Sequence, residues 1–325
     1  MTVFLYGAYG TGNLGDDILL KSALESHPGD TRVIAYGRPF LKHPQDWIDH
    51  DAFIADPKAW LSQGDRLIFA GGGLFWAASH ADVMRNCARA AREVGADVSI
   101  ERIGSQGYHM NEEAVKELMS LSSSITVRDE HSAQILREAG MTDRARYEPD
   151  FALVMQDVPA LAPSERCSIG FNHSATPFFH DPEHRKKALH IYGQLALQNP
   201  DVDFFHIPHT RHFRVMSQND VVFGEYFWNA SGGRIENVRF PDTVEELLGV
   251  YARMWGTMGW RYHLLATSLR MGIPTAFLGQ MGGHKYGAIS REHNLPQIDF
   301  DLTTGAIIGS ANRFIDRVRQ TRGGA

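Results

Sequence analysis

The sequence has few cysteines, no excess of positive charge and no long apolar run. Its two cysteines, Cys87 and Cys167, lie far apart and do not form a metal-binding spacing, so we expect reduced, buried thiols. The 32 basic residues are outnumbered by 38 acidic ones, which gives a net charge of −6 and argues against a nucleic-acid partner. An anionic small substrate stays compatible with this balance, because the local field at a site matters more than net charge.

The chain also lacks segments that target or anchor proteins to membranes. Residues 2–6 read directly as a strand, without the basic region and apolar core of a signal peptide. No uninterrupted apolar run reaches membrane length. We therefore expect a cytoplasmic protein without a transmembrane segment, for which contact with a membrane surface stays open.

A glycine-rich loop at residues 7–15 follows the first predicted strand and precedes a helix. It satisfies G-x-G-x-x-G in the context that a dinucleotide site needs. However, the next strand, at 32–36, ends without the acidic residue that would hold a ribose, and Asp16 and Asp17 would repel a pyrophosphate from the helix start. A tight turn before an acidic helix is the favoured interpretation, and a dinucleotide site is the minor alternative. The chain has neither a Walker-type loop nor a Gly-x-Ser-x-Gly elbow.

Strands alternate with helices along the whole chain, which predicts two parallel sheets covered by helices. Two prolines within 157–164 mark the boundary. We predict Rossmann-like α/β domains at 1–156 and 165–304, facing a cleft in which small ligands bind. Residues 305–325 form an amphipathic helix that could pack back on the N-terminal domain. The strands expected in the second domain are 168–171, 202–207, 239–241 and 275–278.

Arg261 and His263 lie where a glycine-containing loop at 256–259 is expected to become a helix. A helix N-terminus binds anions, an arginine can grip phosphate or carboxylate bidentately, and a histidine can move protons near neutral pH. The alternative is a capping arginine beside a packed histidine. Residues two apart on a helix point away from each other, so both can meet one ligand only if the chain is extended or turning at Arg261.

Three histidines, His206, His209 and His212, are spaced three apart, which on a helix would form a metal-binding row. Pro208 instead indicates a strand that passes into a loop. We therefore predict no metal site, and expect His209 and Arg211 to line the cleft as polar groups.

These motifs together resemble the polysaccharide pyruvyl transferase family. The matching pieces follow the family's order and cover most of the chain: 12–17, Gly71, Gly72 and Gly73, 125–132, 149–151, 261–263 and 272–274. The resemblance implies a GT-B-like fold and transfer of the enolpyruvyl group of phosphoenolpyruvate to a sugar, which forms a pyruvate ketal. Where the family commonly has a Gly-Gln-x-x-Gly-Pro turn, this chain has Gly104-Ser-Gln-Gly-Tyr108.

The resemblance also implies roles for residues. Arg261 and His263 correspond to the family's catalytic R-x-H pair, and Arg128 to its V-R-D arginine. We expect Arg128 and Arg261 to bind the donor, together with Lys285 and the glycines 71–73, without a metal or other cofactor. The acceptor saccharide is expected near Asn13, Trp76, His209 and Arg211, with Trp260 as a further stacking surface.

Two other functions remain open at this stage. A GT-B glycosyltransferase with a nucleotide-sugar donor would need a carboxylate in the C-terminal domain to hold the ribose, and residues 279–285 offer none. A binding module that has lost catalysis is disfavoured by the presence of Arg128, Arg261 and His263 together. The sequence fixes neither the acceptor sugar nor the oligomeric state.

Overall fold

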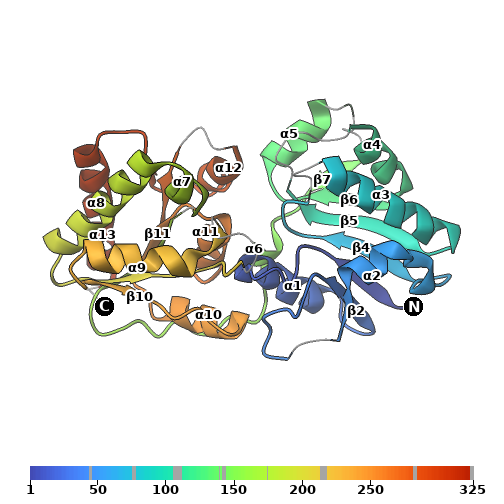
Figure 1. The fold of residues 1–325 in the computed structure, drawn as a ribbon, viewed down its shortest axis with the longest axis horizontal. Coiled ribbons are helices and arrows are strands. Elements are labelled where there is room, and N and C mark those ends of the chain that lie inside the picture. The colour runs from blue at the N-terminus through green and yellow to red at the C-terminus, as the bar shows by residue number, and fades with distance from the viewer. Residues whose placement is uncertain are drawn as a thin grey trace. The chain divides into compact units, whose positions relative to one another are not determined.

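The computed structural model describes residues 1–43, 46–74, 78–104, 112–138, 140, 144–173, 175–212, 218–280 and 284–322. The chain divides into two compact units (Figure 1). Residues 1–11 and 16–156 form the first unit, and residues 12–15 and 157–325 form the second. A short piece of the glycine loop therefore belongs to the second unit.

The first unit is built on a parallel sheet of seven strands in the order β3-β2-β1-β4-β5-β6-β7. Its strands are β1 (Val3–Tyr6), β2 (Thr31–Ala35), β3 (Trp47–Asp49), β4 (Arg66–Ala70), β5 (Asp97–Ile103), β6 (Ser124–Val127) and β7 (Ala145–Tyr147). Its helical segments are α1 (Leu14–Ser26), α2 (His50–Ala55), the 3-10 turn η1 (Pro57–Ala59), α3 (Ala78–Glu93), α4 (Glu112–Leu121), α5 (Glu130–Glu138) and α6 (Phe151–Val154). The strand order reverses between β1 and β4, and ligands of such sheets bind beyond the carboxyl ends of the strands at this point.

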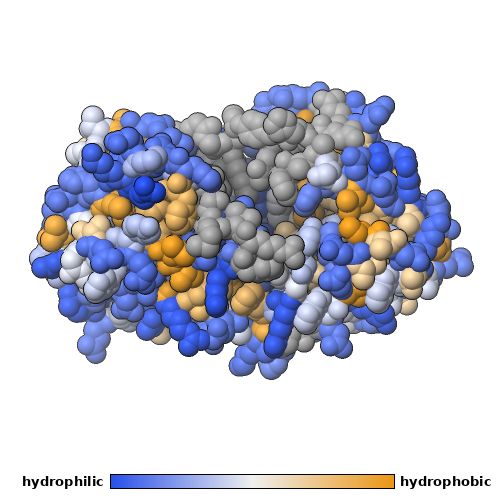
Figure 2. All heavy atoms as spheres, viewed as in Figure 1, coloured by the Kyte–Doolittle hydropathy of each residue, from blue (hydrophilic) through white to orange (hydrophobic). Residues whose placement is uncertain are grey.

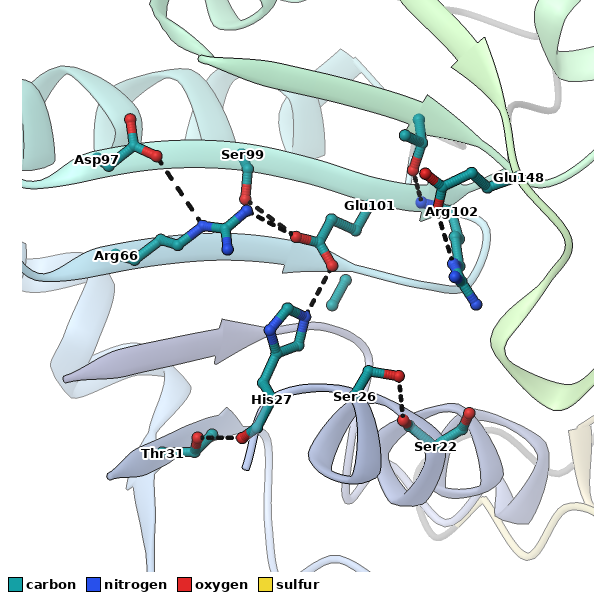
Figure 3. Close-up of polar contacts among 12 residues, drawn as sticks. Ser22, Ser26, His27, Thr31, Arg66, Asp97, Ser99, Glu101, Arg102 and Glu148 are labelled. Atoms are coloured by element: carbon teal, nitrogen blue, oxygen red, sulfur yellow. Dashed lines mark hydrogen bonds and ion pairs between the residues drawn. The ribbon is translucent and has the colours of Figure 1, made fainter. Parts of the chain in front are cut away.

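The two faces of the first sheet differ in polarity along β5. Val98 and Ile100 join the apolar core with residues of α3 and α4, so the alternating Ser99 and Glu101 lie on the opposite face. There Glu101 contacts His27 at 2.8 Å and Arg66 at 3.0 Å (Figure 3). Burial alone would raise the pKa of Glu101, but these partners outweigh it and hold the pKa below its ordinary value.

The second unit is built on a parallel sheet of six strands in the order β10-β9-β8-β11-β12-β13. Its strands are β8 (Ser168–Asn172), β9 (Asp203–His206), β10 (Ile235–Asn237), β11 (Gly256–Gly259), β12 (Thr275–Gly279) and β13 (Gln297–Asp299). Its helices are α7 (Ala175–His180), α8 (Pro182–Gln198), α9 (Asp220–Ala230), α10 (Val244–Ala252), α11 (Tyr262–Arg270), α12 (His284–Glu292) and α13 (Thr304–Arg322). Here the strand order reverses between β8 and β11.

Helix starts in the second unit follow their capping residues. Asp181, Asn219 and Thr243 each accept a hydrogen bond from a backbone N–H in the first turn of α8, α9 and α10. The helices α7 and α9 meet through aromatic side chains, among them Phe178 and Phe223 with ring centroids 5.0 Å apart. Figure 2 shows hydrophobic residues gathered over these two helices on a face that is otherwise mostly hydrophilic.

Two secondary-structure predictions for this unit, one of a loop and one of a strand, were wrong. The segment 256–259, expected to be a loop, is the central strand β11, buried along its whole length between β8 and β12. Its two glycines lower strand propensity, so the pattern concealed it. The short strand expected at 239–241 lies earlier, at β10.

The C-terminal helix α13 contacts α8 and β13, both in the second unit. Its buried side chains lie at helical spacing, which gives the helix one apolar stripe to cover. They are Ile307, Ile308, Ala311, Phe314, Ile315 and Val318. Within the described residues, no helix is both long enough and apolar enough to cross a membrane.

Candidate functional site

Arg261 lies at the strand-order reversal of the second sheet, just beyond β11. It is the N-cap residue of α11, with extended backbone angles (φ −77°, ψ 135°), whereas His263 is the second residue of the helix. The chain is therefore still extended at Arg261 and turns into the helix immediately afterwards. This is the backbone arrangement that the joint prediction for Arg261 and His263 required.

Asp220, the first residue of α9, positions the side chain of Arg261. Its carboxylate is fully buried, and one oxygen accepts a hydrogen bond from Arg261 Nη2. The other oxygen accepts from Asn172 Nδ2 at 3.2 Å and from the backbone N–H groups of His209 (3.0 Å) and Thr210 (3.1 Å). The Arg261 side chain keeps 22% of its surface exposed, and its Nε makes no hydrogen bond to the described residues. Asp220 thus holds Nη2, whereas Nε is buried without a hydrogen-bond partner among the described residues.

Asp220 was not among the site residues predicted from the sequence. The dipeptide Asn219-Asp220 before an apolar run is a helix-start signal, and α9 does begin there with Asn219 as its cap. That signal predicts a helix but not an ion pair. The partner, Arg261, is 41 residues further along the chain.

Buried imidazoles surround this ion pair. His173, His206 and His209 are almost completely buried, and burial is the main cause that lowers their pKa values, with a smaller contribution from the charge of Arg261. At His206 the hydrogen bond to Asn237 and the charge of Asp220 oppose this lowering. The pKa of His209 falls to about 3. These imidazoles are therefore neutral at pH 7 and add no positive charge beside Arg261.

Several buried polar atoms of this region have no hydrogen-bond partner among the described residues. They are Asn172 Oδ1, His173 Nδ1, His206 Nε2, His209 Nδ1 and Thr210 Oγ1. Buried polar atoms are nearly always paired in native proteins, with protein, water or ligand. A concentration of unpaired donors and acceptors next to Arg261 is thus the feature expected of a site that binds a polar ligand or ordered water.

The glycine-loop piece at 12–15 packs on this site. Asn13 forms an antiparallel bridge with Thr210, and Leu14 N–H donates to His209 O at 2.9 Å. Gly15 lies directly against His263, because a Cβ built on it would stand 2.0 Å from Nδ1 of the imidazole. The motif glycine at this position is thus explained by a close contact within the chain, which removes the main reason to invoke a dinucleotide.

The predicted acceptor residues differ in their surroundings. Arg211 is exposed, and Asn13 Oδ1 accepts a hydrogen bond from Gly15 N–H at 3.1 Å. The His209 side chain is 1% exposed and its Nε2 lies 2.6 Å from the Tyr251 hydroxyl, an arrangement that favours a structural role. Trp76 lies outside the described residues, as does the side chain of the predicted donor ligand Lys285. Trp260 is 5% exposed and contacts His173, His184 and Phe300.

In the first unit, Arg128 lies beyond β6 with its guanidinium 1% exposed. It pairs with Asp129 at 3.3 Å and with Asp150 at 3.2 Å. Gly104 packs against this guanidinium, and its N–H donates to Gly72 O at 2.7 Å. Gly71, Gly72 and Arg128 therefore lie at the same edge of the sheet, where Arg128 holds two buried carboxylates. Gly73 follows them, and the donor-binding role of this group stays a prediction.

No three histidine, cysteine or acidic side chains in the described ranges lie close enough to hold a metal ion. The candidate site thus consists of Arg261, its partner Asp220, His263 and a wall of neutral polar groups.

The family model for polysaccharide pyruvyl transferase matches residues 13–280. This match spans most of the sequence, and the chain therefore belongs to the polysaccharide pyruvyl transferase family. A search of curated proteins for sequence relatives found no match.

Solved structures share the fold across nearly the whole chain. The UDP-GlcNAc 2-epimerase of Methanocaldococcus jannaschii matches with a TM-score of 0.62 and 11% identity, covering 97% of this chain and 93% of the epimerase. S. aureus MnaA, in a co-structure with UDP, matches with a TM-score of 0.62 and 10% identity, covering 98% of this chain and 89% of MnaA. Anabaena Alr3699/HepE, in complex with UDP, matches with a TM-score of 0.53 and 11% identity, covering 100% of this chain and 99% of that protein. The predicted GT-B-like α/β fold is confirmed, and identities this low show the fold alone.

Proposed function

We propose that this protein transfers the enolpyruvyl group of phosphoenolpyruvate to two hydroxyls of a saccharide. Family membership supports the reaction class. The observation that carries the proposal is the arrangement at the reversal of the second sheet. There buried Asp220 holds Arg261 Nη2, Arg261 Nε has no hydrogen-bond partner among the described residues, and His263 follows in the first turn of α11.

The proposed reaction adds two sugar oxygens to C2 of phosphoenolpyruvate. One hydroxyl proton ends on the methylene carbon, which becomes a methyl group. The C–O bond to phosphate breaks, and the second hydroxyl proton leaves with inorganic phosphate. The products are a cyclic pyruvate ketal and phosphate, and the reaction involves no net oxidation or reduction.

Each residue has a defined task in this proposal. Arg261 binds the phosphate or carboxylate of the donor, and Asp220 orients its guanidinium. His263 takes a proton from the attacking hydroxyl and returns one to the methylene carbon, a contribution worth about 10²–10⁴-fold. Arginine supplies the countercharge, so the proposed reaction uses no metal or other cofactor. That Arg128, Lys285 and residues 71–73 also bind the donor stays a prediction from the family resemblance.

Thermal unfolding with different ligands tests the donor. Phosphoenolpyruvate, UDP and NADP⁺ are compared on the wild type, on Arg261→Ala and on Arg253→Ala, an exposed arginine at the end of α10 that serves as control. A ligand at 100 times its Kd stabilises the folded state by about 2.7 kcal/mol. We expect stabilisation by phosphoenolpyruvate in the wild type and in Arg253→Ala, but not in Arg261→Ala. Stabilisation by UDP alone would instead support a nucleotide-sugar transferase.

A further inference from the structure

A surface pocket of about 700 Å³ lies in the second unit, at the carboxyl edge of its sheet. The first turns of α8 form one wall, and the segments that follow β12 and β13 form the other. Ligands of parallel α/β sheets bind at this edge, and the volume lies in the range of small-molecule sites. None of the site residues predicted from the sequence is among the described residues that line this pocket.

The polar groups of the pocket carry both signs of charge. Glu183 and Asp301 offer carboxylate acceptors, whereas Lys186 and His190 offer donors. Gln280 already donates to Asp301 Oδ1 at 3.1 Å, and Lys187 donates to the backbone oxygens of Phe300 and Leu302. A phosphate-rich ligand does not match such a lining. The N-terminus of α8 is not free for an anion either, because the Asp181 side chain already accepts hydrogen bonds from its first N–H groups. Sugar hydroxyls both donate and accept, so a mixed lining fits a saccharide.

The pocket adjoins the Arg261 site through one aromatic residue. The lining residues His184 and Phe300 contact the Trp260 ring, with centroids 5.4 Å and 5.7 Å away. Trp260 directly precedes Arg261 in the chain. His184 also lies 2.8 Å from His173, nitrogen to nitrogen, and His173 is one of the buried imidazoles near Arg261. A ligand in this pocket therefore contacts His184 and Phe300, which pack in turn on Trp260 and His173.

We infer that this pocket binds the saccharide whose hydroxyls accept the pyruvyl group. The assignment of that saccharide as the acceptor rests on the proposed function. The pocket holds the sugar through its hydroxyls, with Glu183 and Asp301 as acceptors and Lys186 and His190 as donors. This places acceptor recognition on α8 in addition to the Asn13 and Arg211 region predicted from the sequence.

Saturation-transfer NMR on the full chain tests the pocket. The probes are the methyl glycosides of galactose, glucose, mannose and N-acetylglucosamine. The wild type is compared with a Lys186→Ala/His190→Ala double variant, whose side chains are exposed, and with the control Arg185→Ala on the same helix. Stabilisation by phosphoenolpyruvate is measured on each preparation. We expect at least one glycoside to bind the wild type and the control, with an affinity about fivefold lower or more in the double variant.

The outcomes separate the two proposals. If no glycoside binds the wild type, or if the double variant binds as well as the control, the pocket inference is overturned. The proposed function then stands or falls by the response to phosphoenolpyruvate alone. If glycosides bind in the pocket but phosphoenolpyruvate never stabilises the protein, the saccharide site stands and the proposed donor is refuted.

Discussion

Replacing Gly15 by alanine tests whether the position of His263 matters for function. A Cβ at residue 15 would stand 2.0 Å from Nδ1, 2.6 Å from Cγ and 2.9 Å from Cβ of His263. Ordinary contacts between such atoms are about 3.5 Å, so the imidazole must recede by roughly 1.5 Å. The side chain cannot avoid this by turning its far end, because the close atoms include its own Cβ.

The expected magnitudes distinguish this substitution from a simple change in helix propensity. Alanine in place of glycine favours a helix by up to about 1 kcal/mol, whereas overpacking a buried contact costs about 1–3 kcal/mol. We therefore expect Gly15→Ala to lower the melting temperature. The control, Gly249→Ala in α10, has open space around the new Cβ and should raise it. Each kcal/mol corresponds to about 1.5 °C if the whole chain unfolds together, and to about 2–4 °C if one unit unfolds by itself.

The assay of function is phosphate release from phosphoenolpyruvate in the presence of an acceptor. A displacement of about 1 Å at a catalytic group costs about 10²-fold in rate, so Gly15→Ala should lose about that factor while Gly249→Ala keeps the wild-type rate. If Gly15→Ala is as stable as Gly249→Ala, then the contact does not fix the imidazole. If it is less stable but keeps the wild-type rate, the catalytic role assigned to His263 is wrong.

Three further predictions concern buried charges. Burial, opposed by two backbone hydrogen bonds, raises the pKa of Asp17 from 3.8 to about 7. The contribution of Asp17 to stability is therefore complete below pH ~4 and is lost as the pH rises towards 7. Unfolding curves of Asp17→Asn should lack this loss, and a pH profile equal to that of the wild type would contradict the assignment. Arg128→Met should destabilise the protein by about 3–5 kcal/mol, because it leaves buried carboxylates unpaired. The control Arg137→Met, which removes an exposed ion pair, should cost less than about 1 kcal/mol. Equal losses of unfolding free energy in denaturant would refute this prediction. Asp220→Asn should raise the apparent Kd for phosphoenolpyruvate, measured by thermal stabilisation, about tenfold. The control Asp242→Asn, which removes the exposed ion pair with Arg239, should leave this Kd unchanged. Equal affinities of the two variants would show that Arg261 needs no positioning.

The sequence predicted what local pattern can encode. Alternating strands and helices predicted two parallel sheets, the strand expected within residues 2–6 is β1 (Val3–Tyr6), and Arg261 does lie where extended chain becomes helix. Each of these depends on residues within one turn or one strand of each other. The central strand β11 was missed because glycines, placed there for close packing, have the propensity of a loop.

Long-range pairing could not be read from one sequence. Nothing near Asp220 indicates that its carboxylate binds Arg261, and nothing in the glycine loop indicates that Gly15 contacts His263. Histidine is a further difficulty, because the same side chain serves in a cleft or a core. His209 was predicted to bind the acceptor, yet its imidazole is buried beside Tyr251.

The placement of residues 12–15 within the second unit limits how this protein can be divided. A fragment that begins at Asp157 would contain Thr210 and His263 but not the four residues that bridge to one and cover the other. Exchanging halves between related chains at Gln156 would likewise pair a glycine loop from one parent with a histidine from another. A cut at Gln156 would therefore separate residues 12–15 from Thr210 and His263, the residues that they contact.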